Sequence, residues 1–371
     1  MGDAVKIILS GVNLTEGGPL KIFQDAIESA SKLDAEVICL VNNKELFNEI
    51  NHKRVFFVEI KYPKKNWIYR VFFEYIHSYF IGIKYKPEIW LSLHDMSTNL
   101  PKKIKQFVYC HNSAPFYQIS LKDFKYDKKF SLFTLFYLYL YRINIKSNTA
   151  VICQQSWLAE EFKNKFKIKN VLVSYPIVEN IDNEYNYQLK TKDSGHRKIL
   201  FYPTLPRTFK NIELIIDAIE KKPELSDFLI IYITIDITQG DYAEYLIERA
   251  SRFSCFKFTG YLQREKVNKL YELSDIVIFP SKLETWGLPI SEAVYFNKPI
   301  ILSDLPYAHE TLGDYDKACF IPPDDNVFLS EILKKIIDGE SVFYQTKYIQ
   351  KYATTKGWDS LFNKLLNFVR T

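Results

Sequence analysis

The sequence predicts an α/β protein made of two domains, each built around a doubly wound parallel sheet. Its 371 residues are enough for two domains with separate hydrophobic cores. Short apolar runs rich in β-branched residues alternate with stretches of helical periodicity, as expected for parallel strands joined by helices. The alternation occurs twice, on either side of a polar segment at 179–197. We therefore expect domains at 1–178 and 179–350, followed by a C-terminal segment at 351–371.

The predicted strands are the apolar runs of this alternation. In the first half they lie at 5–10, 35–41, 55–60, 89–93, 106–110 and 149–153, with a helix at 20–33 after the first. In the second half they lie at 198–202, 228–234, 256–259, 276–279, 300–303 and 318–321. Residues 358–370 place apolar side chains at helical spacing and predict a last helix.

The composition is that of an ordinary globular protein, with 47% hydrophobic and 25% charged residues. The five cysteines are scattered, without a CxxC pair or a histidine at metal-binding spacing, which favours a reducing cytoplasm over a disulfide-rich secreted class. Residues 1–10 predict a first strand rather than a signal peptide. No window holds about 18 uncharged apolar residues, so we expect no transmembrane helix and a cytoplasmic protein.

Positive charge is concentrated in residues 51–150. This stretch holds 17 Lys or Arg against 6 Asp or Glu, an excess of 11, whereas the whole chain has a net charge of +5. It contains two aromatic segments of helical length, 66–80 and 130–142, and the second is preceded by Lys122, Lys125, Lys128 and Lys129. Aromatic side chains and lysines suit an anionic membrane surface, so 51–150 is a candidate for peripheral contact with the inner face of the cytoplasmic membrane.

The alternative for this basic stretch is that its helices form the core of the first domain and its lysines are solvated. No nucleic-acid-binding motif accompanies the charge, so we expect no nucleic acid partner.

The segment 279–293 sets two carboxylates, Glu284 and Glu292, eight positions apart across a turn from strand to helix. Gly287 allows a ligand close to the backbone, and Pro289 suits the first turn of a helix, where its missing N–H costs nothing. The N–H groups at such a helix start favour a diphosphate, and ionised carboxylates suit sugar and ribose hydroxyls because they only accept hydrogen bonds. The alternative is structural, with Glu284 complementing the helix dipole and Glu292 solvated.

This Glu-x7-Glu pattern, with Phe-Pro-Ser before it, resembles the donor-site motif of retaining GT-B glycosyltransferases, specifically glycosyltransferase family 4. The resemblance covers most of the second domain and is thinner in the first. It implies two Rossmann-like domains facing across a cleft, with the last helix packing back on the first domain. It also implies that Glu284 holds the donor sugar and Glu292 the ribose. The residues between them that would surround the donor are Thr285, Trp286, Gly287 and Leu288.

The same resemblance assigns a diphosphate-binding segment after the first strand of the second domain. The family places an arginine and a lysine there, and Arg207 and Lys210 occupy this segment, although Arg207 is closer to the lysine than usual. Two cations would neutralise the negative charge that develops on the leaving diphosphate. Asn211 and Asn297 stand where the family commonly has glycine. The alternative is that Arg207 and Lys210 are solvated loop charges.

In the first domain, Gly17 and Gly18 resemble the family's glycine loop, in which bare backbone lies against the diphosphate or the acceptor. His111, after the strand at 106–110, corresponds to the family histidine near the reacting anomeric carbon. Without this context a lone histidine is more often structural.

We expect no cofactor and no metal, the substrate being a nucleotide diphosphate sugar. Asp314 and Asp316 form a DxD pattern, which holds a divalent cation in another glycosyltransferase fold, but they lie in a polar turn far past the donor motif. We therefore expect activity to persist in a chelator.

The predicted protein is a retaining, metal-independent hexosyltransferase that extends a glycan, with a lipid-linked oligosaccharide of lipopolysaccharide, O-antigen or another bacterial surface polysaccharide as acceptor. A front-face mechanism is expected, because the strand ends of the first domain show no convincing second carboxylate. Two alternatives stay open. A sugar-nucleotide epimerase of the same architecture would epimerise a free nucleotide sugar without acceptor, and a non-catalytic nucleotide-sugar or glycan-binding relative would bind donor with neither transfer nor hydrolysis.

Overall fold

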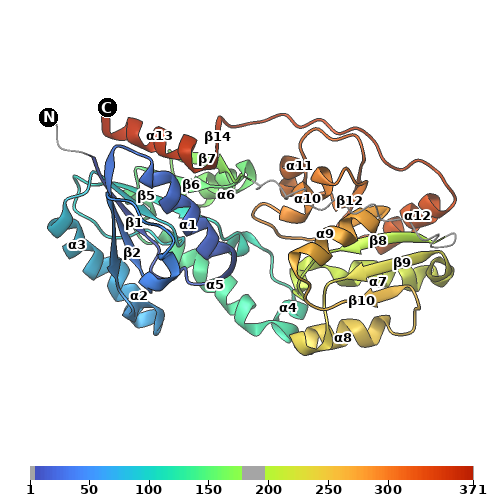
Figure 1. Cartoon of the computed structure of the whole chain (residues 1–371). Coiled ribbons are helices and arrows are strands. Elements are labelled where there is room, and N and C mark those ends of the chain that lie inside the picture. Colours follow the sequence, from blue (N-terminus) through green and yellow to red (C-terminus); the bar gives the residue numbers. More distant parts are fainter. Residues whose placement is uncertain (1–4, 178–196, 371) are drawn as a thin grey trace. The chain divides into compact units, whose positions relative to one another are not determined.

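The computed structural model describes residues 5–177 and 197–370, which divide into two compact units (Figure 1). The first unit consists of 5–116, 134–177 and 351–370, and the second of 117–133 and 197–350. Each unit is a parallel sheet with helices, which confirms the predicted fold class. The polar segment at 179–197, predicted to connect two domains, lies outside the described residues except for its last residue.

Eight parallel strands form the centre of the first unit, in the order β14-β7-β6-β5-β4-β1-β2-β3. The strands are β1 Val5–Ser10, β2 Ala35–Val41, β3 Val55–Glu59, β4 Ile89–Ser92, β5 Lys105–Cys110, β6 Ala150–Cys153, β7 Val171–Tyr175 and β14 Thr354–Lys356. The helices are α1 Gly17–Ser31, α2 Trp67–Phe72, α3 Ser78–Tyr85, α6 Ser156–Phe166 and α13 Gly357–Arg370. The order reverses between β1 and β4, so the loops that follow these strands diverge at the carboxyl edge of the sheet.

Three details of the first unit differ from the sequence prediction. The first helix begins at Gly17 instead of residue 20, because Gly17 adopts a φ of +62° that lets the chain turn into the helix earlier. The helix expected at 66–80 is interrupted by a π-helical turn at Phe73–His77, between α2 and α3. The strands β7 and β14 were not predicted.

The last helix belongs to the core of the first unit. Leu361, Phe362 and Leu365 of α13 are buried in one cluster with Phe23 and Ile27 of α1. Figure 1 shows α13, in red, beside α1, in blue. The predicted return of the last helix to the first domain is therefore confirmed.

The second unit contains a six-stranded parallel sheet in the order β10-β9-β8-β11-β12-β13. Its strands are β8 Lys198–Tyr202, β9 Leu229–Ile233, β10 Phe256–Phe258, β11 Ile276–Phe279, β12 Ile300–Ser303 and β13 Ala318–Ile321. Its helices are α4 Leu121–Tyr126, α7 Ile212–Lys221, α8 Asp241–Ala250, α9 Arg264–Leu273, α10 Leu288–Tyr295, α11 Pro306–Leu312 and α12 Asn326–Ile337. The central strands β11 and β12 are completely buried, as their unbroken apolar sequence predicts.

Residues 117–133 pack with the second unit, although the sequence placed them in the first domain. Phe209 contacts both Tyr117 and Phe130, with ring centroids 6.3 and 5.0 Å apart, and Lys122 forms an ion pair of 2.5 Å with the buried Glu213. The helix α5 Lys128–Arg142 begins in this segment and ends in the first unit.

Candidate functional site

The switch point of the second sheet lies between its neighbouring strands β8 and β11. The chain proceeds from β8 towards β9 and β10 on one side and from β11 towards β12 and β13 on the other. In open parallel sheets ligands bind outside the carboxyl ends of the strands at such a point. Lys210 lies in the loop after β8 and Glu284 in the loop after β11. The topology therefore places two predicted site residues at the position where a ligand is expected.

Lys210 and Glu284 are in direct contact. The Lys210 Nζ lies 2.5 Å from Glu284 Oε1, and both side chains are mostly buried. The backbone at Lys210 is held in place by the buried Tyr202, whose hydroxyl donates a 2.6 Å hydrogen bond to the Lys210 carbonyl. A carboxylate accepts more than one hydrogen bond, so the pair presents one cation and spare acceptor capacity at the same place.

Asn211 explains how this loop is shaped without the usual glycine. It adopts a φ of +57°, in the left-handed region that asparagine tolerates better than most residues. Its buried side-chain amide donates to the carbonyls of Pro280, at 3.1 Å, and Pro323, at 2.7 Å. Asn211 therefore joins the loops after β8, β11 and β13. Asn297 likewise takes a φ of +53° where the family commonly has glycine.

Gly287 directs the chain from the Glu284 loop into α10. Its φ is +80°, and a Cβ at this position would lie 3.2 Å from Ile290 Cδ1 and 3.6 Å from Glu284 Cγ. The neighbouring Trp286 is held from two sides, since its Nε1 donates to Ser291 Oγ at 3.1 Å and its carbonyl accepts from the Thr311 hydroxyl. These contacts hold the Trp286–Gly287 backbone close to the Glu284 side chain.

Glu292 is not a solvated helix residue. It is buried, its Oε1 lies 2.5 Å from Arg264 Nη1, and its Oε2 accepts a 2.6 Å hydrogen bond from the hydroxyl of Tyr271. Burial raises the pKa of Tyr271 well above its ordinary value, and the charge of Glu292 adds to this, so the phenol stays a donor. A ribose hydroxyl at Glu292 would share the carboxylate with these two partners. Sequence reasoning missed Arg264 and Tyr271.

Arg207 points to a different partner from Lys210. Its guanidinium forms a 2.5 Å ion pair with Asp127, in the 117–133 segment, and about half of the side chain is exposed. The structure therefore brings Lys210 and Glu284 together but pairs Arg207 elsewhere within the second unit.

Gly17, Gly18 and His111 belong to the first unit. Gly17 needs glycine for its positive φ, whereas a Cβ at Gly18 would meet nothing within 4 Å and would lie in open space. The loop they form follows β1, and His111 follows β5. Both therefore lie at the carboxyl edge of the first sheet, as predicted.

Asp95 corrects the expectation that no carboxylate lies at this edge. It follows β4, adopts a φ of +66°, and its Oδ1 accepts hydrogen bonds from the backbone N–H groups of His111, at 2.8 Å, and Asn112, at 3.2 Å. The hydroxyl of Tyr141 donates to the same oxygen at 3.3 Å, and His111 Nε2 lies 3.7 Å from Oδ2. A carboxylate two residues after the strand predicted at 89–93 was the available signal.

Beneath this edge lies a second group that sequence reasoning missed. Glu74, completely buried, has its Oε1 3.0 Å from Arg70 Nη2 and 3.4 Å from His94 Nε2, and His94 Nε2 also lies 3.2 Å from Ser10 Oγ. Burial raises the pKa of Glu74 to about 7, against the opposing charge of Arg70. Burial also lowers the pKa of His94 well below its ordinary value, so the imidazole is neutral.

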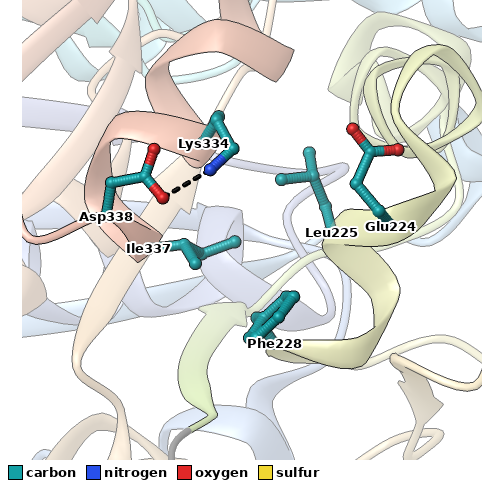
Figure 2. A pocket seen from close by; sticks show the side chains of 6 residues that line it. All are labelled: Glu224, Leu225, Phe228, Lys334, Ile337 and Asp338. Atoms are coloured by element: carbon teal, nitrogen blue, oxygen red, sulfur yellow. Dashed lines mark hydrogen bonds and ion pairs between the residues drawn. The ribbon is translucent and has the colours of Figure 1, made fainter.

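A pocket of about 420 Å³ lies elsewhere on the second unit, and Figure 2 shows the six side chains that line it. Phe228 directly precedes β9, so the pocket is at the amino edge of the sheet, away from Lys210 and Glu284. Lys334 and Asp338 form an ion pair in its wall (Figure 2). None of the predicted site residues lines this pocket.

The chain is similar in sequence to known glycosyltransferases. Residues 184–356 match the family model described as glycosyl transferases group 1. The O-antigen chain mannosyltransferase RfbU of Salmonella typhimurium is 22% identical over 337 residues, which are 89% of this chain and 89% of that protein.

Two solved structures show the fold. A glycosyltransferase from Rickettsia africae superposes with a TM-score of 0.65 at 16% identity, over 99% of this chain and 94% of that one. Anabaena Alr3699/HepE in complex with UDP-glucose superposes with a TM-score of 0.56 at 14% identity, over 90% of each chain. The chain therefore has the two-sheet GT-B fold, and residues 184–356 resemble glycosyl transferases group 1.

Proposed function

We propose that this protein is a retaining glycosyltransferase that moves a hexose from a nucleotide diphosphate sugar to a growing glycan. The observation that carries the proposal is the Lys210–Glu284 pair at the switch point of the second sheet, inside the segment that matches the family model. Mannose is the hexose we propose, because the relative RfbU is an O-antigen chain mannosyltransferase. A nucleotide sugar donor is supported by the HepE complex with UDP-glucose.

In this proposal the charged side chains of the second unit bind different parts of the donor. Lys210 binds the diphosphate and stabilises the negative charge that grows on it as the C–O bond to the anomeric carbon breaks. Glu284 accepts hydrogen bonds from sugar hydroxyls, beside the fixed Trp286 and Gly287 backbone. Arg207, half-exposed on the same loop as Lys210, supplies a second cation when it leaves Asp127.

Retention without a protein nucleophile suits the chemistry of the first unit. Asp95 is the carboxylate at its strand edge, but three donors already engage Asp95 Oδ1, which weakens the carboxylate as a nucleophile. We therefore propose a front-face reaction. The acceptor oxygen bonds to the anomeric carbon on the face from which the diphosphate departs, and the departing phosphate oxygen takes the acceptor proton. Donor transfer then needs neither a metal ion nor a cofactor.

The acceptor we propose is a lipid-linked oligosaccharide of a bacterial surface polysaccharide such as O-antigen. The excess of positive charge in residues 51–150 supports a location on the cytoplasmic face of an anionic membrane, where such an acceptor is presented. The protein would remain peripheral there.

The test separates the two members of the pair. Lys210→Ala should weaken binding of a nucleoside diphosphate and of its sugar conjugate alike, because both carry the diphosphate. Glu284→Gln should leave the nucleoside diphosphate bound normally but lower transfer by at least about a hundredfold, because a lost charged hydrogen bond in the transition state costs about 3 kcal/mol. Calorimetric titration with GDP, UDP and dTDP, and with their hexose conjugates, followed by a transfer assay, measures both.

Glu340→Gln, an exposed glutamate of the same unit, is the matched control and should transfer at the wild-type rate. Undiminished transfer by Glu284→Gln would refute the proposal. Epimerisation of the free nucleotide sugar without acceptor would instead identify an epimerase, and donor binding without transfer or hydrolysis would identify a binding protein.

A further inference from the structure

The helical stretch 67–85 of the first unit buries polar side chains and exposes apolar ones, the opposite of an ordinary surface helix. Its inward face carries Arg70, Glu74 and Ser78, all buried, together with Phe73 and Ile81. Its outward face is apolar, with nine large exposed side chains. They are Trp67, Ile68, Tyr69, Val71, Phe72, Ile76, Tyr79, Phe80 and Ile83. We call these nine side chains the aromatic face.

The exposure of this face is large at individual residues. Ile68 is 79% exposed, Phe80 61% and Trp67 53%. A helix on the surface of a soluble protein normally turns its charged side chains outward and its apolar stripe inward. Contiguous exposed apolar patches of this kind mark sites that meet a membrane or another protein. The π-helical turn at Phe73–His77 shifts the helical phase, so residues on both sides of the turn contribute to one outward face.

The aromatic face continues onto α5. The ring of Trp67 packs edge-on against Tyr137, with centroids 6.3 Å apart. Beside Tyr137, the part of α5 that belongs to the first unit exposes Leu135, Phe136 and Tyr139, and Ile143 is exposed directly after the helix.

The charged side chains around the aromatic face indicate which kind of partner it binds. Exposed lysines precede it, at Lys61, Lys64 and Lys65, and follow it, at Lys84 and Lys86. The only acidic residue between 67 and 85 is Glu74, which is buried on the inward face. Apolar and aromatic side chains in the middle with lysines at both ends match the acyl boundary and the anionic headgroups of a bilayer surface.

The dimensions fit a helix that lies on a bilayer rather than across it. At 1.5 Å per residue, the 19 residues from Trp67 to Tyr85 span about 28 Å parallel to the surface. Among the helices of the described residues, none has both the length and the hydrophobicity needed to cross a bilayer.

We propose that the aromatic face is the membrane-docking surface of this protein, inserted at the headgroup boundary of an anionic bilayer. The proposal rests on the membrane-linked acceptor of the proposed function and locates the contact. It also moves the contact away from the lysines that the sequence singled out. Of these, Lys122 pairs with the buried Glu213, and Lys125 lies 4.7 Å from the ring of Tyr126, both within the second unit.

The test compares two isoleucines of similar exposure. Ile68 on the aromatic face and Ile349 in the second unit are 79% and 85% exposed, so a glutamate at either position should leave the fold intact. In co-sedimentation with vesicles of phosphatidylglycerol and phosphatidylcholine, without donor or acceptor, Ile68→Glu should raise the lipid concentration for half-maximal binding at least about tenfold. Ile349→Glu, with the same change of charge, should bind as the wild type does.

A second readout places the contact. Lipids brominated near the headgroup should quench tryptophan fluorescence of the wild-type protein on binding. At lipid concentrations that bind both proteins fully, Trp67→Phe should show much less quenching. Equal vesicle binding by Ile68→Glu and the wild type would overturn the proposal. So would a wild-type dimer that Ile68→Glu converts to a monomer with unchanged vesicle binding, since the face would then join two copies. Because no sugar transfer is measured, failure here is distinguishable from failure of the proposed activity.

Discussion

Glu74 is a carboxyl group enclosed in the first unit, with Arg70 and His94 as its neighbours. An ionised carboxylate loses hydration when it is buried, and one nearby arginine restores only part of that free energy. This is why the pKa of Glu74 rises to about 7. His94 shows the complementary response, because burial and the charges of Arg70 and His111 lower its pKa and keep the imidazole neutral. The pKa values of the two groups are therefore shifted in opposite directions, and burial favours the neutral form of each group.

The sign of the Glu74 effect follows from the two pKa values. The unfolded chain releases this proton near pH 4.5, and the folded chain near pH 7. The stability that Glu74 contributes is therefore fully present below about pH 4.5 and is lost as the pH rises through about 7. Glu74→Gln cannot titrate. The unfolding free energy of the wild type should fall relative to that of Glu74→Gln between these pH values, by up to about 3 kcal/mol.

Tryptophan fluorescence is suited to this measurement, because Trp67, Trp90, Trp157 and Trp358 belong to the first unit and only Trp286 to the second. Denaturant unfolding of both proteins at pH 5, 6 and 8 gives the difference. Glu49→Gln, an exposed glutamate of the first unit, controls for the substitution itself. A difference that stays constant with pH, or a wild type that gains stability relative to Glu74→Gln as the pH rises, would contradict the buried carboxyl.

At the scale of elements, α13 is the clearest case of a distant segment completing a core. Phe362 is fully buried in the cluster with α1, the ring of Trp358 lies 4.9 Å from that of Tyr109, and Ser29 of α1 donates a hydrogen bond to Asp359. Next to α13, the strand β14 pairs in parallel with β7 at the edge of the first sheet. Residues 351–370 are therefore part of the first unit, although residues 197–350 come between them and the rest of it.

Replacing Phe362 by alanine should destabilise the first unit by about 3–5 kcal/mol, the usual cost of a large cavity in a core. Phe328→Ala, at a partly exposed phenylalanine of α12 in the second unit, should cost much less. Thermal unfolding followed by tryptophan fluorescence reports mainly on the first unit and should show the shift for Phe362→Ala. Loss of stability confined to the second unit would show that α13 is not part of the first core.

The elements that could be predicted from the sequence are those whose burial requires a run of consecutive apolar residues. Strands such as β11 and β12 are covered on both faces, so they appear as unbroken apolar runs. In β7 the apolar run is only three residues long before Ser174, and β14 consists of two threonines and a lysine, so neither strand has a long apolar run. The packing of α4 on the second unit depends on contacts of Lys122 with Glu213 and of Tyr126 with Tyr242. These partners are about 90 and 116 positions away in the sequence, so the helical periodicity of α4 does not predict them.

The same distinction holds within the site. Lys210 and Glu284 could be brought together in advance, because both follow parallel strands and the carboxyl ends of such strands share one edge. Arg264 and Tyr271 could not be connected with Glu292, because they lie on α9 and only packing of the helices brings them to the carboxylate. Asp95 follows a strand whose end could be predicted, but its hydrogen bonds to the backbone N–H groups of His111 and Asn112 connect positions 16 and 17 residues away, which the sequence pattern does not contain.

For the molecule as a whole, catalysis by fixed cations predicts a response to metal removal. In the proposed mechanism Lys210 and Arg207 supply the positive charge that a divalent cation supplies in other glycosyltransferases. The candidate DxD motif has another role in the structure, since Asp314 Oδ1 accepts a 2.8 Å hydrogen bond from the backbone N–H of Tyr348 and both aspartates are exposed. Within residues 5–177 and 197–370 no cluster of three or more metal-type ligands is found.

Transfer should therefore proceed at the same rate with and without excess EDTA, and Asp316→Asn should leave it unchanged. Lys210→Ala should lose transfer under both conditions, and added Mn²⁺ should not restore it, because Glu284 would be left there as a single carboxylate and the described residues contain no cluster of three or more metal-type ligands. Initial rates measured with a nucleotide hexose donor, before and after dialysis against chelator, decide the point. A rate that EDTA abolishes and Mn²⁺ restores in the wild type would show that a metal ion, and not the lysine, carries the charge of the leaving diphosphate.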